Sequence, residues 1–151
     1  MVLKNFELEN CSVDFFNPKG LGQIEKLSVA GNKIPNFNGF IMSEKTKEEL
    51  KEGGFSQEHG RLLLPDCGLT YLNCHDNEFE YFPYVAIHKM ADLKKANFAR
   101  NKITKLIDDS ERKIFKLSIK RGRLTEPFQV FKVLKSLDLS SNLLTQFPEE
   151  L

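Results

Sequence analysis

Three consecutive residues, Cys74, His75 and Asp76, are the densest group of side chains in the sequence that could do chemistry. A cysteine beside a histidine can act as a nucleophile with its general base, and Cys67 would add a third metal ligand. The segment around them alternates apolar and polar residues, which is typical of a β-strand. Because successive side chains of a strand point to opposite faces, Cys74 and His75 are expected to point apart. We therefore predict neither a catalytic nor a metal site here.

The rest of the chain offers little more for catalysis. Gly20-Leu-Gly22 is too short for a phosphate-binding loop and no lysine follows it. No pair of carboxylates stands out by its spacing. The chain is therefore not expected to be an enzyme, and no catalytic residue, cofactor or metal ligand is predicted.

Composition indicates a folded protein of one domain. The 151 residues are 40% hydrophobic and 28% charged, with a net charge of +1. No apolar run approaches the roughly 18 residues that a membrane-spanning helix needs. The three cysteines are odd in number and scattered, which favours a reducing compartment, the cytoplasm or the nucleus.

A short pattern recurs along the chain. It has apolar residues at its first, fourth, sixth and eleventh positions, and Asn or Cys at its ninth. Six segments fit its apolar positions: Leu3/Phe6/Leu8/Cys11/Val13, Ile24/Leu27/Val29/Asn32/Ile34, Leu69/Leu72/Cys74/Asn77/Phe79, Leu93/Ala96/Phe98/Asn101/Ile103, Ile114/Leu117/Ile119/Gly122/Leu124 and Leu134/Leu137/Leu139/Asn142/Leu144. Only Gly122 departs from the Asn/Cys position. Recurrence at a fixed period predicts a solenoid.

This pattern resembles the leucine-rich-repeat family, whose consensus is LxxLxLxxN/CxL. The resemblance implies an α/β right-handed solenoid shaped as an arc, with a parallel β-sheet on the concave face and short helices or loops on the convex face. The period-two Leu-x-Leu segment independently predicts a strand in each repeat. The asparagine is expected where the chain turns out of the strand, where its amide can bond open backbone groups of adjacent turns.

The repeats begin near residues 3, 24, 69, 93, 114 and 134, so one spacing of 45 residues is about twice the others. We expect a single domain over 1–151 with an insertion or degenerate repeat at about 41–67. The segment from Ser43 to Gly54 is expected to form a short helix, because Thr46 and Glu49 have capping-box spacing. The final repeat stops in mid-coil. This indicates a fragment of a longer protein, or an edge covered by a partner or a second copy.

Function is expected on the concave face. The segment Lys89–Arg123 has twelve basic and four acidic residues, a net charge of +8, which favours an acidic protein partner over RNA or phospholipid head groups. Equally open is a solvated basic surface without a partner. The predicted partner-binding residues lie on neighbouring strands: Tyr71, Asn73, His75, Lys95, Asn97, Arg100, Lys116, Ser118, Lys120 and Arg121.

Two further expectations follow from the repeats. The chain is a protein-interaction module or, as the alternative, a substrate-recognition or targeting arm of a larger protein whose catalytic domain lies outside these residues. The many phenylalanines are expected to stack as a hydrophobic spine on the return side of the coils. The residues expected there are Phe15, Phe16, Phe37, Phe82, Phe128 and Phe147.

Overall fold

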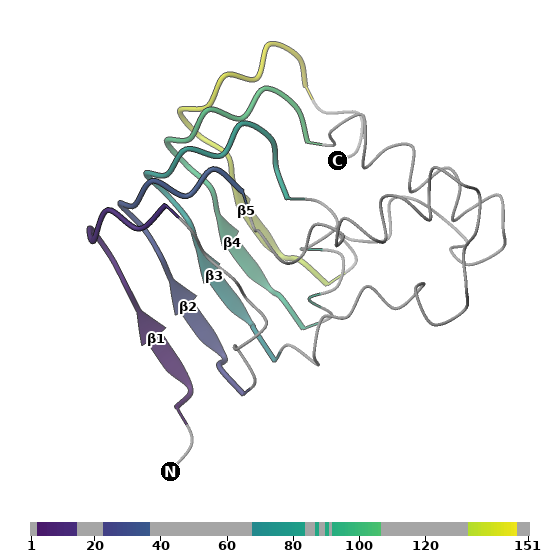
Figure 1. Ribbon diagram of the computed structural model, residues 1–151. Coiled ribbons are helices and arrows are strands. Elements are labelled where there is room, and N and C mark those ends of the chain that lie inside the picture. The colour runs from purple at the N-terminus through teal and green to yellow at the C-terminus, as the bar shows by residue number, and fades with distance from the viewer. Residues whose placement is uncertain are drawn as a thin grey trace, which may run out of the picture.

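The computed structural model describes residues 3–14, 23–36, 68–83, 87, 90, 92–106 and 133–147. Within these ranges the chain forms one parallel sheet whose strands follow each other in chain order. In Figure 1 the five arrows lie side by side and point the same way. The strands are β1 (Asn5–Glu7), β2 (Lys26–Ser28), β3 (Tyr71–Asn73), β4 (Lys95–Asn97) and β5 (Ser136–Asp138). We refer to each strand with the described segment that follows it as coils 1 to 5.

The strands form because one side of each can be buried and the other can stay polar. The central residue of each strand points inward, and these residues are aligned across the sheet in the order Phe6, Leu27, Leu72, Ala96 and Leu137. Two positions later the next inward residue is again apolar. The sheet therefore shows the alternation of inward apolar and outward polar residues that the sequence predicts. The prediction of a parallel-sheet solenoid is confirmed.

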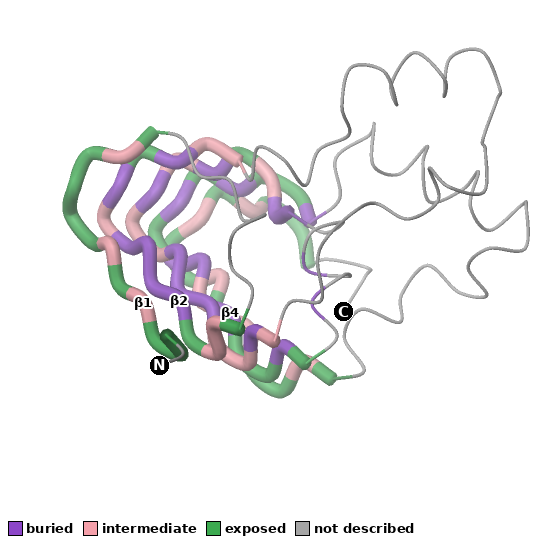
Figure 2. Tube along the Cα trace, turned by 60° about the horizontal axis from the view of Figure 1, so that its bottom comes forward, coloured by how far each residue is buried: buried purple, intermediate pink, exposed green. Residues whose placement is uncertain are grey.

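The core is best covered in the middle of the sheet. Leu27, Leu72 and Ala96 are buried, whereas Phe6 and Leu137 on the edge strands are only partly buried. Figure 2 shows the coil of β1 mostly as exposed and intermediate, with the buried positions concentrated in the coils behind it. An inner coil has a neighbour on both sides, which explains the gradient.

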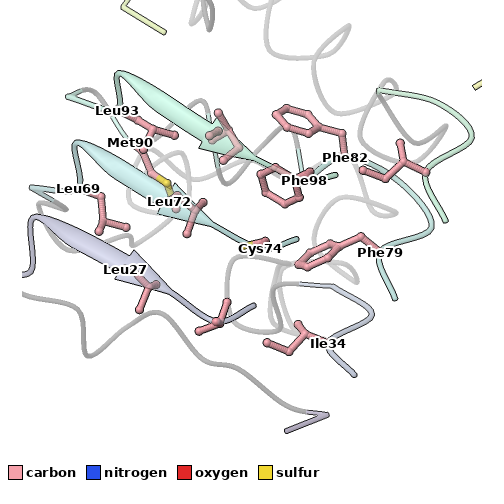
Figure 3. Packing of buried hydrophobic residues seen from close by; sticks show 14 of the residues in the cluster. Leu27, Ile34, Leu69, Leu72, Cys74, Phe79, Phe82, Met90, Leu93 and Phe98 are labelled. Atoms are coloured by element: carbon pink, nitrogen blue, oxygen red, sulfur yellow. The ribbon is translucent and has the colours of Figure 1, made fainter. Parts of the chain in front are cut away.

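An aromatic group fills the space between the strands and the return segments. The ring of Phe98 meets those of Phe79 and Phe82 edge-on, with centroid distances of 5.3 and 5.1 Å. Figure 3 shows these rings side by side, with Cys74 close to Phe79. The prediction of a return-side spine is confirmed for Phe82, which is fully buried. It is wrong for Phe147, which is 82% exposed next to β5, the edge strand of the described sheet. Phe15, Phe16, Phe37 and Phe128 lie outside the described residues.

Asparagines tie each coil to the one before it. Asn77 shows the pattern: its Oδ1 accepts from the Ile34 amide at 3.0 Å, and its Nδ2 donates to the Val29 carbonyl at 2.9 Å. Nδ2 also lies 3.2 Å from the carbonyl of Cys74 in its own coil. The same bonds recur at Asn32, Asn101 and Asn142.

Coil 1 has no described coil before it, and Cys11 replaces the asparagine there. The Cys11 thiol donates instead to the Glu9 carbonyl of its own coil, at 3.1 Å. At the other four positions the asparagine amide bonds both its own turn and the preceding coil, and at coil 1 the thiol bonds only its own turn.

The residue before each ladder position has a left-handed backbone. The five residues are aligned one per coil, with φ between 53° and 66°: Asn10, Gly31, Asp76, Arg100 and Ser141. At Gly31 an added Cβ would lie 2.0 Å from Asn10 Oδ1, so a side chain cannot be accommodated without a shift. Arg100 adopts the left-handed conformation although this costs free energy for a residue with a side chain. The contacts of its side chain are described below.

In the described sheet, β4 is hydrogen-bonded to β3 on one side and to β5 on the other. Residues 107–132 themselves lie outside the described residues, as does the segment 37–67 with the expected helix and the insertion at about 41–67. The elements of the described part are strands, so the expected convex helices are not confirmed.

The described part of the chain contains no helix that is long and apolar enough to cross a lipid bilayer.

Candidate partner-binding face

The outward side chains of the five strands stand in rows that cross the sheet. The first row, set by the strand register, consists of Asn5, Lys26, Tyr71, Lys95 and Ser136. The second row, two residues further along each strand, consists of Glu7, Ser28, Asn73, Asn97 and Asp138. We call these two rows together the outer sheet face.

At the centre of the first row, three side chains have no hydrogen-bond or ion-pair partner among the described residues. Tyr71 is half-buried and stands on β3 between the exposed Lys26 on β2 and the exposed Lys95 on β4. Neighbouring strands are about 4.8 Å apart, so the two lysine Cα atoms lie roughly 10 Å from each other. Within the described residues neither lysine has a carboxylate within salt-bridge distance.

The second row is largely occupied by hydrogen bonds within the sheet. Asn73 donates from Nδ2 to the Ser28 hydroxyl at 3.1 Å, and Ser28 in turn donates to the Glu9 carboxylate. Asn97 Oδ1 accepts from the Ala99 amide at 2.9 Å. Asn73, with 8% of its surface exposed, therefore stabilises the strand ends more than it offers a contact to a partner.

Asp138 completes the second row on β5. Its Oδ1 accepts from the Ser140 amide at 2.9 Å, and hydrogen bonds from Ser140 hold the pKa of the Asp138 carboxyl below its ordinary value. The carboxylate thus stays charged at the edge of the face, with its main hydrogen bonds directed to its own chain.

A charged cluster lies beyond the ends of β3 and β4. Arg100 forms a two-pronged contact with Asp76, from Nε to Oδ1 at 2.6 Å and from Nη2 to Oδ2 at 2.7 Å. His75 Nδ1 lies 2.7 Å from Asp76 Oδ2 and 3.3 Å from Arg100 Nη2. Hydrogen bonding to the Arg100 guanidinium lowers the pKa of Asp76 from its ordinary 3.8 to about 2, and burial opposes this only in part.

Acidification is expected to remove the contribution of the Asp76–Arg100 pair to stability. The pKa of Asp76 in the folded state lies below its ordinary value, so the contribution is present above about pH 4 and is lost as the pH falls towards 2. Because the pair is exposed, we expect Asp76→Asn to lower the free energy of unfolding by at most about 1 kcal/mol at pH 7. Asparagine also tolerates the left-handed backbone at this position.

Urea unfolding of both proteins at pH 7 and pH 2 checks this expectation. The wild type and Asp76→Asn should differ clearly at pH 7 and much less at pH 2, where about half of the folded Asp76 is protonated. An equal difference at both pH values would mean that the side-chain charge is not the cause.

The predicted site residues are only partly brought together. Tyr71, Asn73, His75, Lys95, Asn97 and Arg100 lie on or just beyond β3 and β4, on one side of the sheet. Lys116, Ser118, Lys120 and Arg121 lie outside the described residues, and β5 is the described strand that follows β4 in the sheet. The expectation that they stand next to Lys95 stays a prediction. Whether the others bind a partner stays a prediction.

Two features of the face were not apparent from the sequence. Lys26 is a neighbour of Tyr71 although 45 residues separate them along the chain, so only the register reveals the pair of lysines. Arg100, predicted as an open anchor, is held by Asp76 from the preceding coil. The alignment of equivalent positions in successive repeats could have suggested this second contact.

No catalytic arrangement forms around Cys74. Its side chain is fully buried on the inner side of the sheet, whereas His75 is part of the exposed cluster, so the prediction that they point apart is confirmed. Burial also raises the pKa of the Cys74 thiol well above its ordinary value, which disfavours the reactive thiolate. In the described part of the chain no three His, Cys, Asp or Glu side chains gather to hold a metal ion.

Comparison with known families bears on the repeat itself. A family model described as Leucine Rich Repeat matches residues 133–151, which include β5 and the ladder residue Asn142. The other four described coils pair in the same parallel register, have apolar inward residues at the same position and make the same left-handed turn. The segment that the family model matches is thus the last of five described coils built alike, which together form a solenoid of the leucine-rich-repeat type.

Two individual proteins are similar to this chain. An adenylate cyclase of Schizosaccharomyces pombe is 27% identical over 159 residues, which cover 95% of this chain and 9% of that protein. The structure of a leucine-rich-repeat protein of Leptospira interrogans aligns with a TM-score of 0.42 and 22% identity, over 98% of this chain and 40% of the other. The chain thus spans less than a tenth of the length of the cyclase.

Proposed function

We propose that this chain is a protein-binding module that holds its partner against the outer sheet face. The observation that carries the proposal is the first row, where Lys26, Tyr71 and Lys95 stand side by side without partners in the described part of the chain. Tyrosine is enriched where binding energy concentrates, and a polar surround is typical of such sites.

The scaffold beneath the row favours binding over other uses of the face. The asparagine ladder and the buried side chains of β2, β3 and β4 fix the backbone at every position of the row. A partner would therefore lose little free energy in ordering the protein when it docks. Leucine-rich repeats elsewhere serve unrelated partners on one scaffold, so the side chains of the face decide what is bound.

A second proposal concerns the protein to which the chain contributes. The similarity to an adenylate cyclase, of which the chain would span only 9%, favours a recognition or targeting arm of a larger protein. Such an arm would bring a substrate or an anchoring partner to a catalytic domain outside this chain. Both proposals place the partner on the outer sheet face. They differ only in whether this chain is joined to a catalytic domain.

Photo-crosslinking tests the use of the face. A photoreactive phenylalanine analogue placed at Ser136, exposed in the first row, is expected to capture a protein from a lysate of the source organism. The same analogue at Thr104, which is exposed on a return segment, is the matched control. We expect adducts from position 136 and few from position 104. Adducts from position 104 alone would contradict docking on the outer sheet face.

A further inference from the structure

We infer that the three central residues of the first row recognise an acidic peptide segment in which two carboxylates flank an apolar side chain. Lys26 and Lys95 would each contact one carboxylate, and the ring of Tyr71 would contact the apolar side chain between them. This inference rests on the proposed function and names the chemistry of the partner.

Lys26 and Lys95 are the two basic residues of the first row, and the ion pairs of the described residues do not involve them. Lys4 pairs with Glu25 at 2.7 Å, and Lys102 lies 3.8 Å from Glu78. Arg100 is held by Asp76, as described above. Lys26 and Lys95 have no such contact in the ranges that the structure describes, although both are exposed on the same face.

The acidic residues near the row do not neutralise it. Glu9 accepts from the Ser28 hydroxyl, and Asp138 accepts from Ser140. Glu7 is exposed on β1, diagonal to Lys26, and is the acidic residue of the second row closest to it. Within the two rows, acidic residues therefore occur only on the edge strands, as Glu7 on β1 and Asp138 on β5, while Glu25 and Asp76 outside the rows pair with Lys4 and Arg100.

The spacing of the row fits an extended peptide that crosses the strands. Side chains on one face of an extended chain repeat about every 6.8 Å, so three of them span roughly 14 Å. The two lysine Cα atoms are about 10 Å apart by the strand spacing. The flexible side chains of the two lysines can spread apart and bridge the roughly 4 Å by which the peptide positions exceed the Cα separation. A carboxylate, an apolar residue and a second carboxylate at alternate positions therefore match Lys26, Tyr71 and Lys95 in order.

A protein segment fits this row better than a nucleic acid does. Single-stranded nucleic acid is bound by several aromatic side chains on which successive bases stack. The first row has one aromatic residue, Tyr71, and none follows it in the second row. Two lysines on the row would also neutralise few phosphates, so the affinity that comes from counterion release would be small.

Fluorescence anisotropy with the whole chain and three labelled peptides tests the inference. The peptide GESFSEG carries the proposed pattern, GESASEG lacks the apolar side chain, and GKSFSKG reverses the charges. We expect GESFSEG to bind and GKSFSKG not to bind. Tyr71→Ser should weaken the binding of GESFSEG several-fold and leave GESASEG, already the weaker ligand, nearly unchanged.

A matched pair of charge variants separates the row from bulk charge. Lys26→Glu/Lys95→Glu and Lys33→Glu/Lys135→Glu both change the net charge from +1 to −3, because each of two lysines loses one positive and gains one negative charge. Lys33 and Lys135 are exposed but lie outside the two rows. Exposed ion pairs contribute roughly two- to fivefold each. Reversing both lysines of the row is therefore expected to weaken GESFSEG binding by about tenfold or more, and the control pair by less than about twofold.

Each other outcome would overturn the inference. It is wrong if both charge variants weaken binding equally, if GKSFSKG binds as well, or if an eight-nucleotide uridine RNA binds more tightly through the same lysines. Circular dichroism and urea unfolding must show that the variants are folded. If GESFSEG fails to bind while position 136 still captures a protein, the acidic chemistry is wrong and the proposed function stands. If both experiments fail, the outer sheet face is not the binding surface.

Discussion

Phe98→Ala is expected to lower the free energy of unfolding by about 3–5 kcal/mol, because it removes a large side chain from the centre of the core. Phe98 is fully buried and its ring meets Phe79 and Phe82 edge-on. The alanine would leave a cavity between coils 3 and 4 that their strands, fixed by hydrogen bonds on both sides, cannot close. Such a loss is a large part of the total stability of an ordinary domain. Urea unfolding monitored by circular dichroism measures it.

Two further variants separate cavity formation from a general effect of losing phenylalanine. Phe98→Leu keeps most of the volume and should cost clearly less than Phe98→Ala. Phe147→Ala removes a side chain that is 82% exposed and should change stability by no more than about 0.5 kcal/mol. Equal losses for Phe98→Ala and Phe147→Ala would mean that the packing around Phe98 is not as described.

Asn77→Ala is expected to lower the free energy of unfolding by about 2–4 kcal/mol, since buried polar groups would lose their partners. The Ile34 amide would lose its acceptor and the Val29 carbonyl would lose the donor that Asn77 supplies. Both groups belong to the preceding coil, and no water reaches them easily because Asn77 itself is buried. The loss should therefore loosen the contact between coils 2 and 3. Chemical unfolding measures the loss of unfolding free energy. Faster hydrogen exchange at the Ile34 amide would show that the loss arises between coils 2 and 3.

The ladder provides its own graded controls. Asn142→Ala should cost less than Asn77→Ala, because Asn142 is half-exposed in the last described coil. Cys11→Ala should cost least, since the exposed Cys11 thiol bonds only to the Glu9 carbonyl of its own coil and the backbone amide of residue 11 keeps its bond to Asn32. Equal losses at these three positions would contradict the account in which the amide acts by bridging to the coil before it.

The repeat pattern was sufficient to predict most of the fold. Five of the six matched segments form strands at the expected residues, and their central apolar residues point inward, as Leu27 and Leu72 do. The ladder was equally predictable, because the backbone groups of a buried turn need hydrogen-bond partners and an asparagine at the ninth position can supply them. Local pattern decides local structure here, since each repeat contains its own strand and turn.

The pairing of strands was not predictable from the same pattern. The segment 114–124 fills every apolar position of the template, yet β4 pairs directly with β5. The ladder gives a physical reason. Asn142 supplies the amide that bonds the Phe98 carbonyl and the Ile103 amide of coil 4, whereas Gly122 has no amide to offer. Among the described residues, the bridge to coil 4 therefore comes from Asn142, and the segment 114–124 lies outside them.

The candidate site was predictable residue by residue but not in its arrangement. Tyr71 and Lys95 were placed on the outer face by alternation alone. The neighbour on the other side of Tyr71 is Lys26, which the sequence separates from it by 45 residues. Asp76 and Arg100 occupy equivalent positions of successive repeats, which could have suggested their contact, but its geometry depends on side-chain conformations at two left-handed residues.

Amide chemical-shift mapping tests the central claim, that a partner docks on the outer sheet face. The partner captured through position 136 would be titrated into the ¹⁵N-labelled chain, whose 151 residues suit such spectra. We predict that the largest shifts fall on the amides of β2, β3 and β4, with Tyr71 and Lys95 among them. Shifts concentrated on return segments such as 102–106, with the strand amides unchanged, would contradict the account.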